Sequence, residues 1–338
     1  MRKVLLVATR HSIFNQPVRR AFLGAGISLE EVDYRGNFIL MPGLFTHRVA
    51  ARLPAILRRP IFKFAQDSVD RKILKKAKQF KPDLIFILKA KDVGLGTIDK
   101  LRIISKTANW YPETFDHWEN IRVIAPHYNY FFCYDPDLVE SLKVQGYGGA
   151  RYLPFCAEIN NVSARPCLSK RKYDITFIGS FMPIRYAQRE VILSQVKDLG
   201  LNIWGNKAWL GTSLRDCYRG RPSTEEMLQI YRDSKIVINV DLMVGIPGSG
   251  VNLRPFEITS CGALLLNHND RRDIFNLFED GKEFISFNGA EDIREKVLYC
   301  LQNQSKLDEM AVAGFEKTKA RHTYANRIEE VINIIKNN

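Results

Sequence analysis

Short apolar runs alternate with segments of helical character along the first half of the chain. An amphipathic stretch near 17–25 and a basic segment over 66–80 are predicted to be helices. The apolar runs predict strands at 4–9, 83–88, 106–111 and 130–134, and the sequence RYLPF predicts one more at 151–155. Strands separated by helices need crossover connections, so this half predicts a parallel sheet.

The same rhythm starts again after a polar stretch at 157–172, which we interpret as a linker between two α/β halves. Strands are predicted at 174–179, 202–205, 235–240, 263–267 and 283–287. Helices are predicted at 184–199, 223–233, 254–261, 271–279, 290–302 and 305–320. Ser223 followed by Glu226 has the spacing of a capping box, which supports the start of one of these helices.

The composition is that of a soluble globular protein, with 46% hydrophobic and 26% charged residues. A length of 338 residues favours two domains. No apolar segment approaches the ~20 residues of a membrane span, and MRKVLLVATRHS fits a first strand better than a signal peptide. The six cysteines are scattered without a CxxC pair, which argues against zinc or disulfide frameworks and favours a reducing cytoplasm.

The net charge of +13 is concentrated near the N-terminus, where residues 1–100 hold 20 Lys and Arg against 8 Asp and Glu. Cations and large apolar residues interleave over 34–81. Such a region is either a solvated face or a surface for an anionic partner. The interleaving favours an anionic membrane surface. No nucleic-acid partner is expected, because no DNA- or RNA-binding signature occurs.

Ligands of open parallel sheets bind beyond the carboxyl ends of the strands. After the strand at 174–179, the loop GSFMPIR offers Gly179, Ser180 and Arg185 to a phosphate, although the two small residues would also serve as a plain turn and cap. A second loop, GSGVNLRPFE, places Arg254 and Glu257 three residues apart on one helical face. A carboxylate there suits two ribose hydroxyls and an arginine suits a diphosphate, while a simple Arg–Glu helix cap is the alternative.

The segment NLRPFEITSCGALLLNHNDRRDIFNLFEDGKEFISF, followed by RHTYANRIEEV, resembles the donor-binding domain of glycosyltransferases with the GT-B architecture. It is most similar to the CgeB-like branch, with a C-terminal domain of the group 1 type. The resemblance covers roughly 172–335 and is looser in the first half. It implies an α/β fold of two Rossmann-like domains whose parallel sheets face a central cleft. The expected domains are an acceptor-side domain over 1–160, a nucleotide-sugar-binding domain over 161–318, and a helix over 319–338 that packs back toward the first domain.

The resemblance also implies roles for individual residues. Glu257 matches the ribose-binding glutamate that ends the E-x7-E motif of related enzymes, and the first position of that motif falls on Ser249. Arg185 and Arg254 would hold the diphosphate in place of a metal, so neither a metal nor a cofactor is expected. The stretch that contains Arg221 would lie near the nucleobase, and the donor sugar would be lined by Gly248, Gly250 and Asn252.

Two places offer a catalytic base for the acceptor hydroxyl. His11 follows the first strand, where inverting GT-B enzymes often carry a histidine. Glu113 and Asp116 stand among aromatic residues in WYPETFDHW, and aromatic rings commonly stack on sugars. Inert loop residues are the alternative in both cases. Asp135 and Asp137 form a D-x-D like the manganese motif of another glycosyltransferase architecture, but Pro136 between them favours helix capping.

These observations predict a metal-independent, nucleotide-sugar-dependent glycosyltransferase of bacterial surface-glycan assembly. The expected acceptor is a glycan or a lipid-linked molecule. The enzyme is expected in the cytoplasm, peripheral at the inner face of the plasma membrane. The alternatives are a GT-B-fold nucleotide-sugar epimerase, which would need no acceptor site, and a non-catalytic basic protein that binds membranes or nucleic acid.

Overall fold

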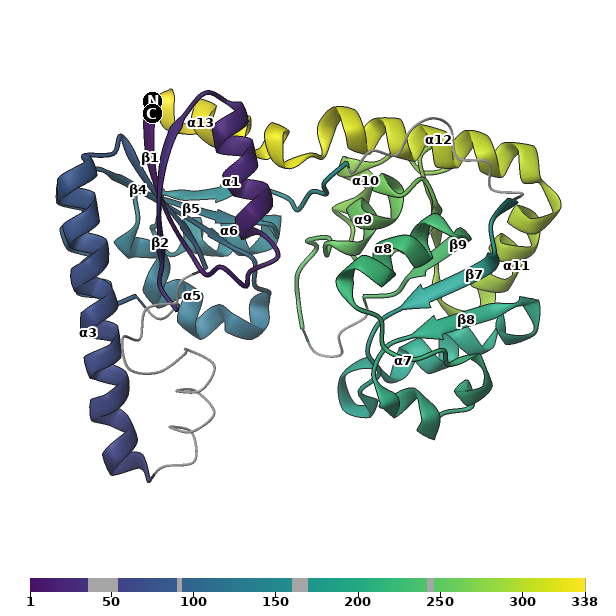
Figure 1. Ribbon diagram of the computed structural model, residues 1–338. Helices are drawn as coiled ribbons and strands as arrows, with labels where there is room; N and C mark the ends of the chain where they lie inside the picture. The colour runs from purple at the N-terminus through teal and green to yellow at the C-terminus, as the bar shows by residue number, and fades with distance from the viewer. Residues whose placement is uncertain (36–53, 90–92, 160–169, 242–245, 338) are drawn as a thin grey trace. The chain divides into compact units, whose positions relative to one another are not determined.

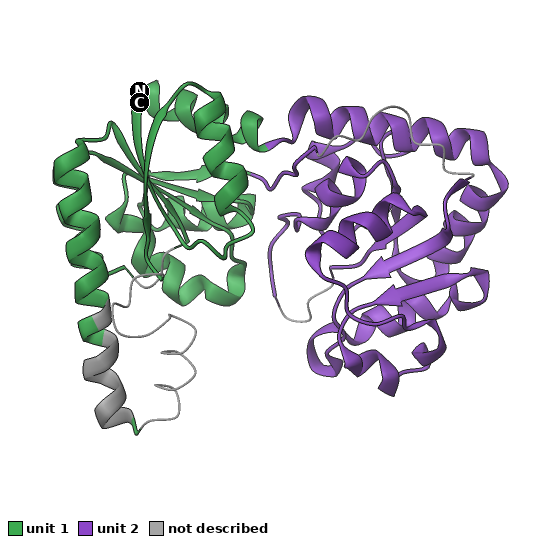
Figure 2. Ribbon diagram, in the orientation of Figure 1, with its two compact units in different colours: residues 1–153, 324–338 green, residues 154–323 purple. Residues whose placement is uncertain are grey.

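Two parallel β-sheets, each in its own unit, organise the protein in the computed structural model, which describes residues 1–35, 54–89, 93–159, 170–241 and 246–337. The first unit contains residues 1–153 together with 324–338, and the second contains residues 154–323 (Figure 2). The predicted boundary at 160 and most of the predicted linker lie outside the described residues, as does the basic stretch 36–53.

The first sheet has six parallel strands. Their order is β2 (Ser28–Asp33), β1 (Lys3–Ala8), β3 (Leu84–Leu88), β4 (Lys106–Tyr111), β5 (Tyr130–Cys133) and β6 (Ala150–Tyr152). The central strand β3 reads LIFIL and is buried throughout, as expected for a parallel sheet covered on both faces. The helices around the sheet are α1 (Asn15–Gly24), α3 (Ala55–Phe80), α4 (Leu95–Ile104), α5 (Trp118–Ile124), α6 (Pro136–Val144) and α13 (Tyr324–Lys336).

Helix α13 comes from the end of the chain and packs beside α1 in the first unit (Figure 1). Its apolar face buries Ile328, Val331 and Ile335. The Tyr324 ring lies 6.3 Å from that of Trp110, and the Lys106 ammonium donates to the Ile335 carbonyl at 3.1 Å. The last helix is therefore part of the core of the N-terminal unit.

The second sheet has five parallel strands. Their order is β11 (Ile285–Phe287), β10 (Leu264–His268), β9 (Ser234–Asn239), β7 (Tyr173–Ile178) and β8 (Leu201–Trp204). The direction of winding reverses between β7 and β9, and such a switch point is where doubly wound sheets bind ligands. The helices are α7 (Pro183–Ser194), α8 (Thr224–Arg232), α9 (Arg254–Ser260), α10 (Ile274–Leu277), α11 (Gly289–Gln302) and α12 (Gln304–Arg321).

The predicted α/β architecture is confirmed, and every predicted strand is found with bounds that differ by at most three residues from the prediction. Two capping predictions also hold: Ser223 and Glu226 form a full capping box, and Asp135 accepts a hydrogen bond from the backbone of Asp137. The edge strand β2 was not predicted, because SLEEVD is polar and buries only Val32. The predicted helix over 271–279 is wrong in length, since only Ile274–Leu277 is helical.

The five described cysteines are buried, and Cys167 lies outside the described residues. None of the helices in the described ranges is both long and apolar enough to cross a membrane.

Candidate functional site

A group of buried charges lies at the carboxyl edge of the second sheet, beside the switch point between β7 and β9. The chain leaves β7 through Gly179 and Ser180, and it leaves β9 through Val240 and Asp241. Asp241 is 9% exposed, although it is ionisable. A charge is rarely buried without partners, so the residues around Asp241 show what the site is built to hold.

Arg189 of α7 ties the two strand ends together. The residue is 1% exposed, and its side chain donates to the Val240 carbonyl at 3.0 Å and to the Ser180 carbonyl at 2.6 Å. The guanidinium also lies 4.0 Å from an Asp241 oxygen and stacks over the Tyr186 ring. Burial lowers the pKa of Arg189, with repulsion from Arg254 acting in the same direction and Asp241 opposing it. Its hydrogen-bonding capacity is directed at the protein.

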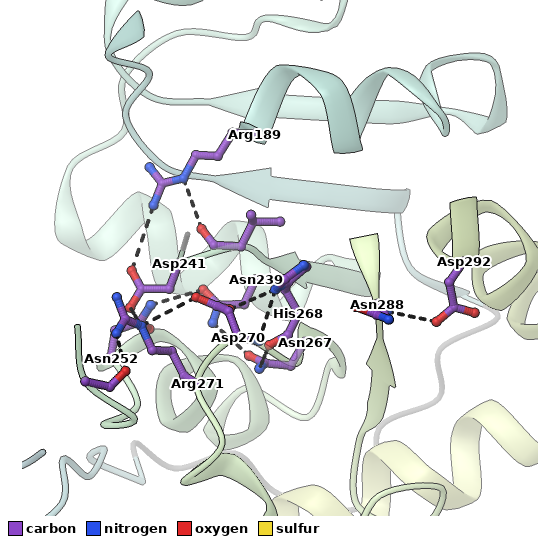
Figure 3. Close-up of polar contacts among 12 residues, drawn as sticks. Arg189, Asn239, Asp241, Asn252, Asn267, His268, Asp270, Arg271, Asn288 and Asp292 are labelled. Atoms are coloured by element: carbon purple, nitrogen blue, oxygen red, sulfur yellow. Dashed lines mark hydrogen bonds and ion pairs between the residues drawn. The ribbon is translucent and has the colours of Figure 1, made fainter. Parts of the chain in front are cut away.

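Arg271 holds the other side of the same carboxylate (Figure 3). Its Nε atom lies 3.7 Å from Asp241 and 3.4 Å from Asp270, and its Nη1 donates to the Gly248 carbonyl at 2.5 Å. Asp270 in turn contacts the His268 ring at 2.9 Å. Burial raises the pKa of Asp241, while Arg254, Arg271 and a hydrogen bond from Asn252 oppose the rise.

The glycine-containing loop before α9 is fixed by this network. Gly248 has a φ of +120°, in the region that favours glycine, and its carbonyl accepts from Arg271. The Ser249 carbonyl accepts from the backbone of Asp273 at 3.2 Å. Asn252 accepts from the backbone N–H of Arg254 at 3.0 Å and orients the first turn of α9. Gly250 is buried next to them.

Arg254 and Glu257 differ from the residues of this network. Among the described residues neither side chain has a hydrogen bond or an ion pair within 4 Å, and both are partly exposed. Their surroundings are nevertheless of low polarity: desolvation raises the pKa of Glu257 to about 7, with Arg254 acting against it. One cation and one carboxyl group are thus left with unused hydrogen-bonding capacity at the edge of a rigid site.

Of the other predicted donor-site residues, some adjoin the charged network and others lie apart from it. Gly179 is packed tightly, because its carbonyl accepts from the Trp209 indole at 2.8 Å and a Cβ at Gly205 would lie 2.1 Å from that same oxygen. Ser180 is exposed and shares Arg189 with the network. Arg185 is partly buried at the start of α7. Arg221 is exposed and follows Gly220, whose carbonyl accepts from the backbone of Gly205, on the far side of β8 from the charged network.

The predicted base residues lie at the carboxyl edge of the first sheet, in two places. Glu113 follows β4 and forms ion pairs with Lys89 and with His117, the latter at 3.1 Å. Lys89 has a φ of +61°, an uncommon conformation for a residue with a side chain. Asp116 lies in the short turn Phe115–His117 next to this group. His11 is exposed after β1, which is separated from β4 by β3 and therefore by about 10 Å. The catalytic roles of all three stay predictions.

Sequence reasoning missed the residues that build the network: Arg189, Asp241, Asp270 and Arg271. Asp241 and Asp270 each follow a predicted strand, so their positions at strand ends were the available signal. Arg189 lies inside a helix among other polar residues, and nothing in its local sequence distinguishes it. Within the described ranges, no group of three or more His, Cys, Asp or Glu side chains has the arrangement of a metal site. That the reaction needs no metal stays a prediction.

Residues 188–333 match a protein-family model described as glycosyl transferase-like. A search of curated proteins finds no match. Among solved structures, HepE of Anabaena in complex with UDP-glucose superimposes with a TM-score of 0.63 at 9% identity, covering 100% of both chains. Sucrose-phosphate synthase of Thermosynechococcus elongatus gives 0.67 at 10% identity and covers 100% of this chain and 99% of its own. The lipopolysaccharide outer core galactosyltransferase WaaB gives 0.62 at 10% identity, with 99% of each chain covered.

The predicted GT-B architecture is confirmed, because the similarity to these structures spans both units. Most of the family match, residues 188–323, falls on the unit that carries the charged network, and the match agrees with the predicted glycosyltransferase class. The CgeB-like branch stays a prediction.

Proposed function

We propose that the protein transfers a sugar from a nucleotide-sugar donor to an acceptor hydroxyl. One observation carries the proposal: in the described part of the chain the side chains of Arg254 and Glu257 have no hydrogen-bonding partner, while Arg189 and Arg271 beside them donate to backbone carbonyls and face Asp241. A guanidinium binds a diphosphate bidentately, and a carboxylate accepts hydrogen bonds from two ribose hydroxyls. The two groups together therefore suit a nucleoside diphosphate.

In this proposal each member of the site has a separate task. Arg254, with Arg185 at the start of α7, stabilises the negative charge that develops on the leaving diphosphate. Glu257 binds the ribose. Arg189 and Arg271 are positioning residues, since they hold the strand ends and the loop with Gly248, Ser249, Gly250 and Asn252 that would line the donor sugar.

The nucleotide, the acceptor and the setting belong to the same proposal. The solved complexes of HepE contain UDP, glucose and UDP-glucose, which makes UDP the first nucleotide to test on this chain. A glycan or lipid-linked acceptor and a role in surface-glycan assembly at the cytoplasmic face of a membrane fit the basic N-terminal region. Ser249, where related enzymes carry a glutamate, is the feature that favours a binding protein without activity.

Thermal unfolding in the presence of UDP, GDP, ADP, CMP and dTDP tests the donor site. One nucleotide is expected to raise the unfolding midpoint. Glu257→Gln and Arg254→Gln are each expected to weaken the binding of that nucleotide by about 10- to 100-fold, because each removes a charge-assisted hydrogen bond. Glu279→Gln and Arg272→Gln, which change exposed residues of the same unit, should bind normally.

Stabilisation by polyanions but by none of the nucleotides would contradict the proposal. If a nucleotide binds, incubating its sugar conjugate with and without acceptors separates the enzyme classes. A glycosylated acceptor supports the transferase, a changed donor sugar supports the epimerase, and an unchanged donor supports the binding protein.

A further inference from the structure

Tyr231 of α8 carries a buried hydroxyl group that has no partner. The residue is 0% exposed, and its Oη atom forms no hydrogen bond in the described part of the chain. Leaving a buried polar group unpaired costs about 1–3 kcal/mol, so such groups are rare in folded proteins. A phenylalanine would fill nearly the same space without this cost, so the hydroxyl itself is the feature that needs a role.

Arg171, which precedes β7, joins the end of α8 to the end of α9. Its Nη1 atom donates to the Tyr231 carbonyl at 3.3 Å. Its Nη2 atom donates to the carbonyls of Cys261 at 3.4 Å and of Gly262 at 2.8 Å. The backbone N–H of Cys261 in turn donates to the Glu257 carbonyl at 3.2 Å, one turn back along α9. The last turn of α8 is therefore held against α9 close to Glu257.

Glu257 is the ionisable group that acts most strongly on the Tyr231 hydroxyl. Burial raises the pKa of Tyr231, the negative charge of Glu257 raises it further, and Arg254 opposes the rise. The Cys261 thiol has a smaller effect in the same direction as Glu257, and Arg232 of α8 acts on that thiol. The hydroxyl and the carboxyl group therefore lie in one poorly hydrated region between α8 and α9.

The two groups complement each other as donor and acceptor. The Glu257 side chain accepts no hydrogen bond from the residues that the structure describes, and the Tyr231 hydroxyl donates none to them. Desolvation raises the pKa of Glu257 to about 7, so the carboxyl group ionises near neutral pH. An ionised carboxylate gains most from a nearby donor, because hydrogen bonds to charged groups are about twice as strong as those between neutral groups. The Tyr231 hydroxyl stays protonated in this range, because its own pKa is raised.

We propose that Tyr231 is a positioning residue for Glu257. When Glu257 is ionised, the Tyr231 hydroxyl donates a hydrogen bond to one carboxylate oxygen and leaves the other oxygen to accept from a ribose hydroxyl. Arg171 already holds the backbones of the two helices together, so the bond requires a movement of side chains only. Tyr231 has no accessible surface, so it acts through Glu257 and does not touch the nucleotide. The bond does not depend on the proposed function, whereas its use in holding a ribose rests on it.

A chain labelled with ¹³C at the carboxyl carbons of its glutamates tests the bond without any nucleotide. The NMR signal that disappears in Glu257→Gln belongs to Glu257, and its chemical shift follows the ionisation of that group between pH 5 and pH 9. Tyr231→Phe is expected to raise the pH at which this signal titrates, because it removes the donor that stabilises the ionised form. Tyr299→Phe is the matched control, since it changes an exposed tyrosine of α11 in the same unit, and it should leave the titration unchanged.

The thermal midpoint of the free chain separates this role from a purely structural one. At pH 5, where Glu257 is protonated, Tyr231→Phe should keep or raise the midpoint, because it removes a buried hydroxyl that has no partner in the described structure. At pH 9 the same substitution should lower the midpoint, because the ionised carboxylate loses its donor. A hydroxyl that contributes only to packing would change the midpoint equally at both pH values, and this result would contradict the proposal.

Nucleotide affinity tests the second part of the proposal, with UDP as the first probe and the other four nucleotides named above as alternatives. At pH 8, Tyr231→Phe is expected to weaken the nucleotide that binds by about 3- to 10-fold, the contribution of one hydrogen bond. In a chain that already carries Glu257→Gln, adding Tyr231→Phe should leave the affinity unchanged, because no carboxylate remains to be positioned.

The proposal is overturned if Glu257 titrates at the same pH in Tyr231→Phe as in the unmodified chain. It is also overturned if Tyr231→Phe weakens the nucleotide equally with and without the Glu257 carboxylate. If a nucleotide binds equally well to Tyr231→Phe and to the unmodified chain, the proposed function stands and the positioning role fails. If the titration shifts as expected but none of the five nucleotides binds, the bond stands and the proposed function fails.

Discussion

Three neighbouring arginines of the C-terminal unit differ in their exposure and in their hydrogen-bonding partners. Arg189 and Arg271 are nearly inaccessible, and they donate to backbone carbonyls and face Asp241. Arg254 is partly exposed, and its side chain donates to nothing in the described structure. Removing one of the first two would leave Asp241 short of a partner and cost about 3–5 kcal/mol, whereas Arg254 can be changed at small cost to stability. Structure and ligand binding are therefore assigned to different side chains.

Glu257 makes stability depend on pH in a direction opposite to that of an ordinary surface carboxylate. Its pKa is raised to about 7 in the folded chain, so the folded state holds a proton that the unfolded state releases near pH 4.5. The associated stability is present below pH 4.5 and is lost as the pH rises through 7. Relative to Glu257→Gln, the chain should lose about 2 kcal/mol of unfolding free energy between pH 5 and pH 8, as measured by urea denaturation.

Nucleotide affinity should follow the opposite course, because the ionised carboxylate is the better acceptor of ribose hydroxyls. UDP should bind more tightly at pH 8 than at pH 6, and Glu257→Gln should remove this dependence. An equal pH dependence in the Gln variant would show that another group titrates.

The sequence draws attention to Glu257 and Arg254 of the proposed donor site, but not to the residues that surround them. Arg254 and Glu257 lie in one short segment, NLRPFE, so their position on the same helical face follows from their spacing in the sequence. Arg189, Asp241 and Arg271 lie on different elements, and their proximity follows only from the order of the strands.

Among the elements, α3 has the most unusual surface. It is 26 residues long, and its described part exposes Lys63, Arg71, Lys75 and Lys78 together with Phe64, which is 67% exposed. On the other side of the helix, Val69, Ile73 and Ala77 pack into the core. A helix with a buried face and a second face of cations beside an exposed aromatic ring suits an anionic membrane surface.

The double variant Lys75→Glu/Lys78→Glu tests this suggestion. Each basic residue near an anionic bilayer contributes about 1 kcal/mol, so binding to phosphatidylserine vesicles should fall at least tenfold. Lys207→Glu/Lys306→Glu changes the net charge equally in the other unit and should have little effect. Equal sedimentation of the unmodified chain with neutral and anionic vesicles would count against membrane binding altogether.

Elements with a strong apolar run were predictable, and those defined by their neighbours were not. The strand KTANWY was predicted at its observed bounds because five of its six residues are buried. Strand β2 is polar, and it is a strand because β1 offers it an edge with which to pair. Helix α3 extends eleven residues before its predicted start, through an apolar and basic segment that contains Pro60.

At the scale of the whole molecule, the last thirteen helical residues belong to the unit that contains the first residues. Helix α13 buries Ile328, Val331, Ile332 and Ile335. Burying a side chain of this kind contributes about 1.5–3 kcal/mol, and four of them approach the whole stability of an ordinary domain, which is about 5–15 kcal/mol.

A chain that ends at Thr323 is therefore expected to lose the cooperative unfolding of the N-terminal unit and to keep that of the C-terminal unit. In scanning calorimetry the full chain should show two transitions or one merged peak, and the truncated chain should show a single transition. Limited proteolysis of the truncated chain should degrade residues 1–153 first. A chain without its last two residues serves as the control. Loss of both units together would show that they fold as one.

The two-unit architecture was predictable because the rhythm of strands and helices restarts in mid-chain. The charged network of the C-terminal unit was not predictable, because its residues come from α7 and from the segments that follow β9 and β10. Their meeting depends on the order of the strands, which no short stretch of sequence records.

The return of α13 has a consequence for the order of synthesis. As the chain emerges from the ribosome, most of the N-terminal unit is made first, but that unit lacks one of its helices until residues 324–336 have been translated. The C-terminal unit, continuous over 154–323, can fold beforehand. The face of the first unit that α1 shares with α13 stays open during that interval, so the half of the protein that is translated first is the half that matures last.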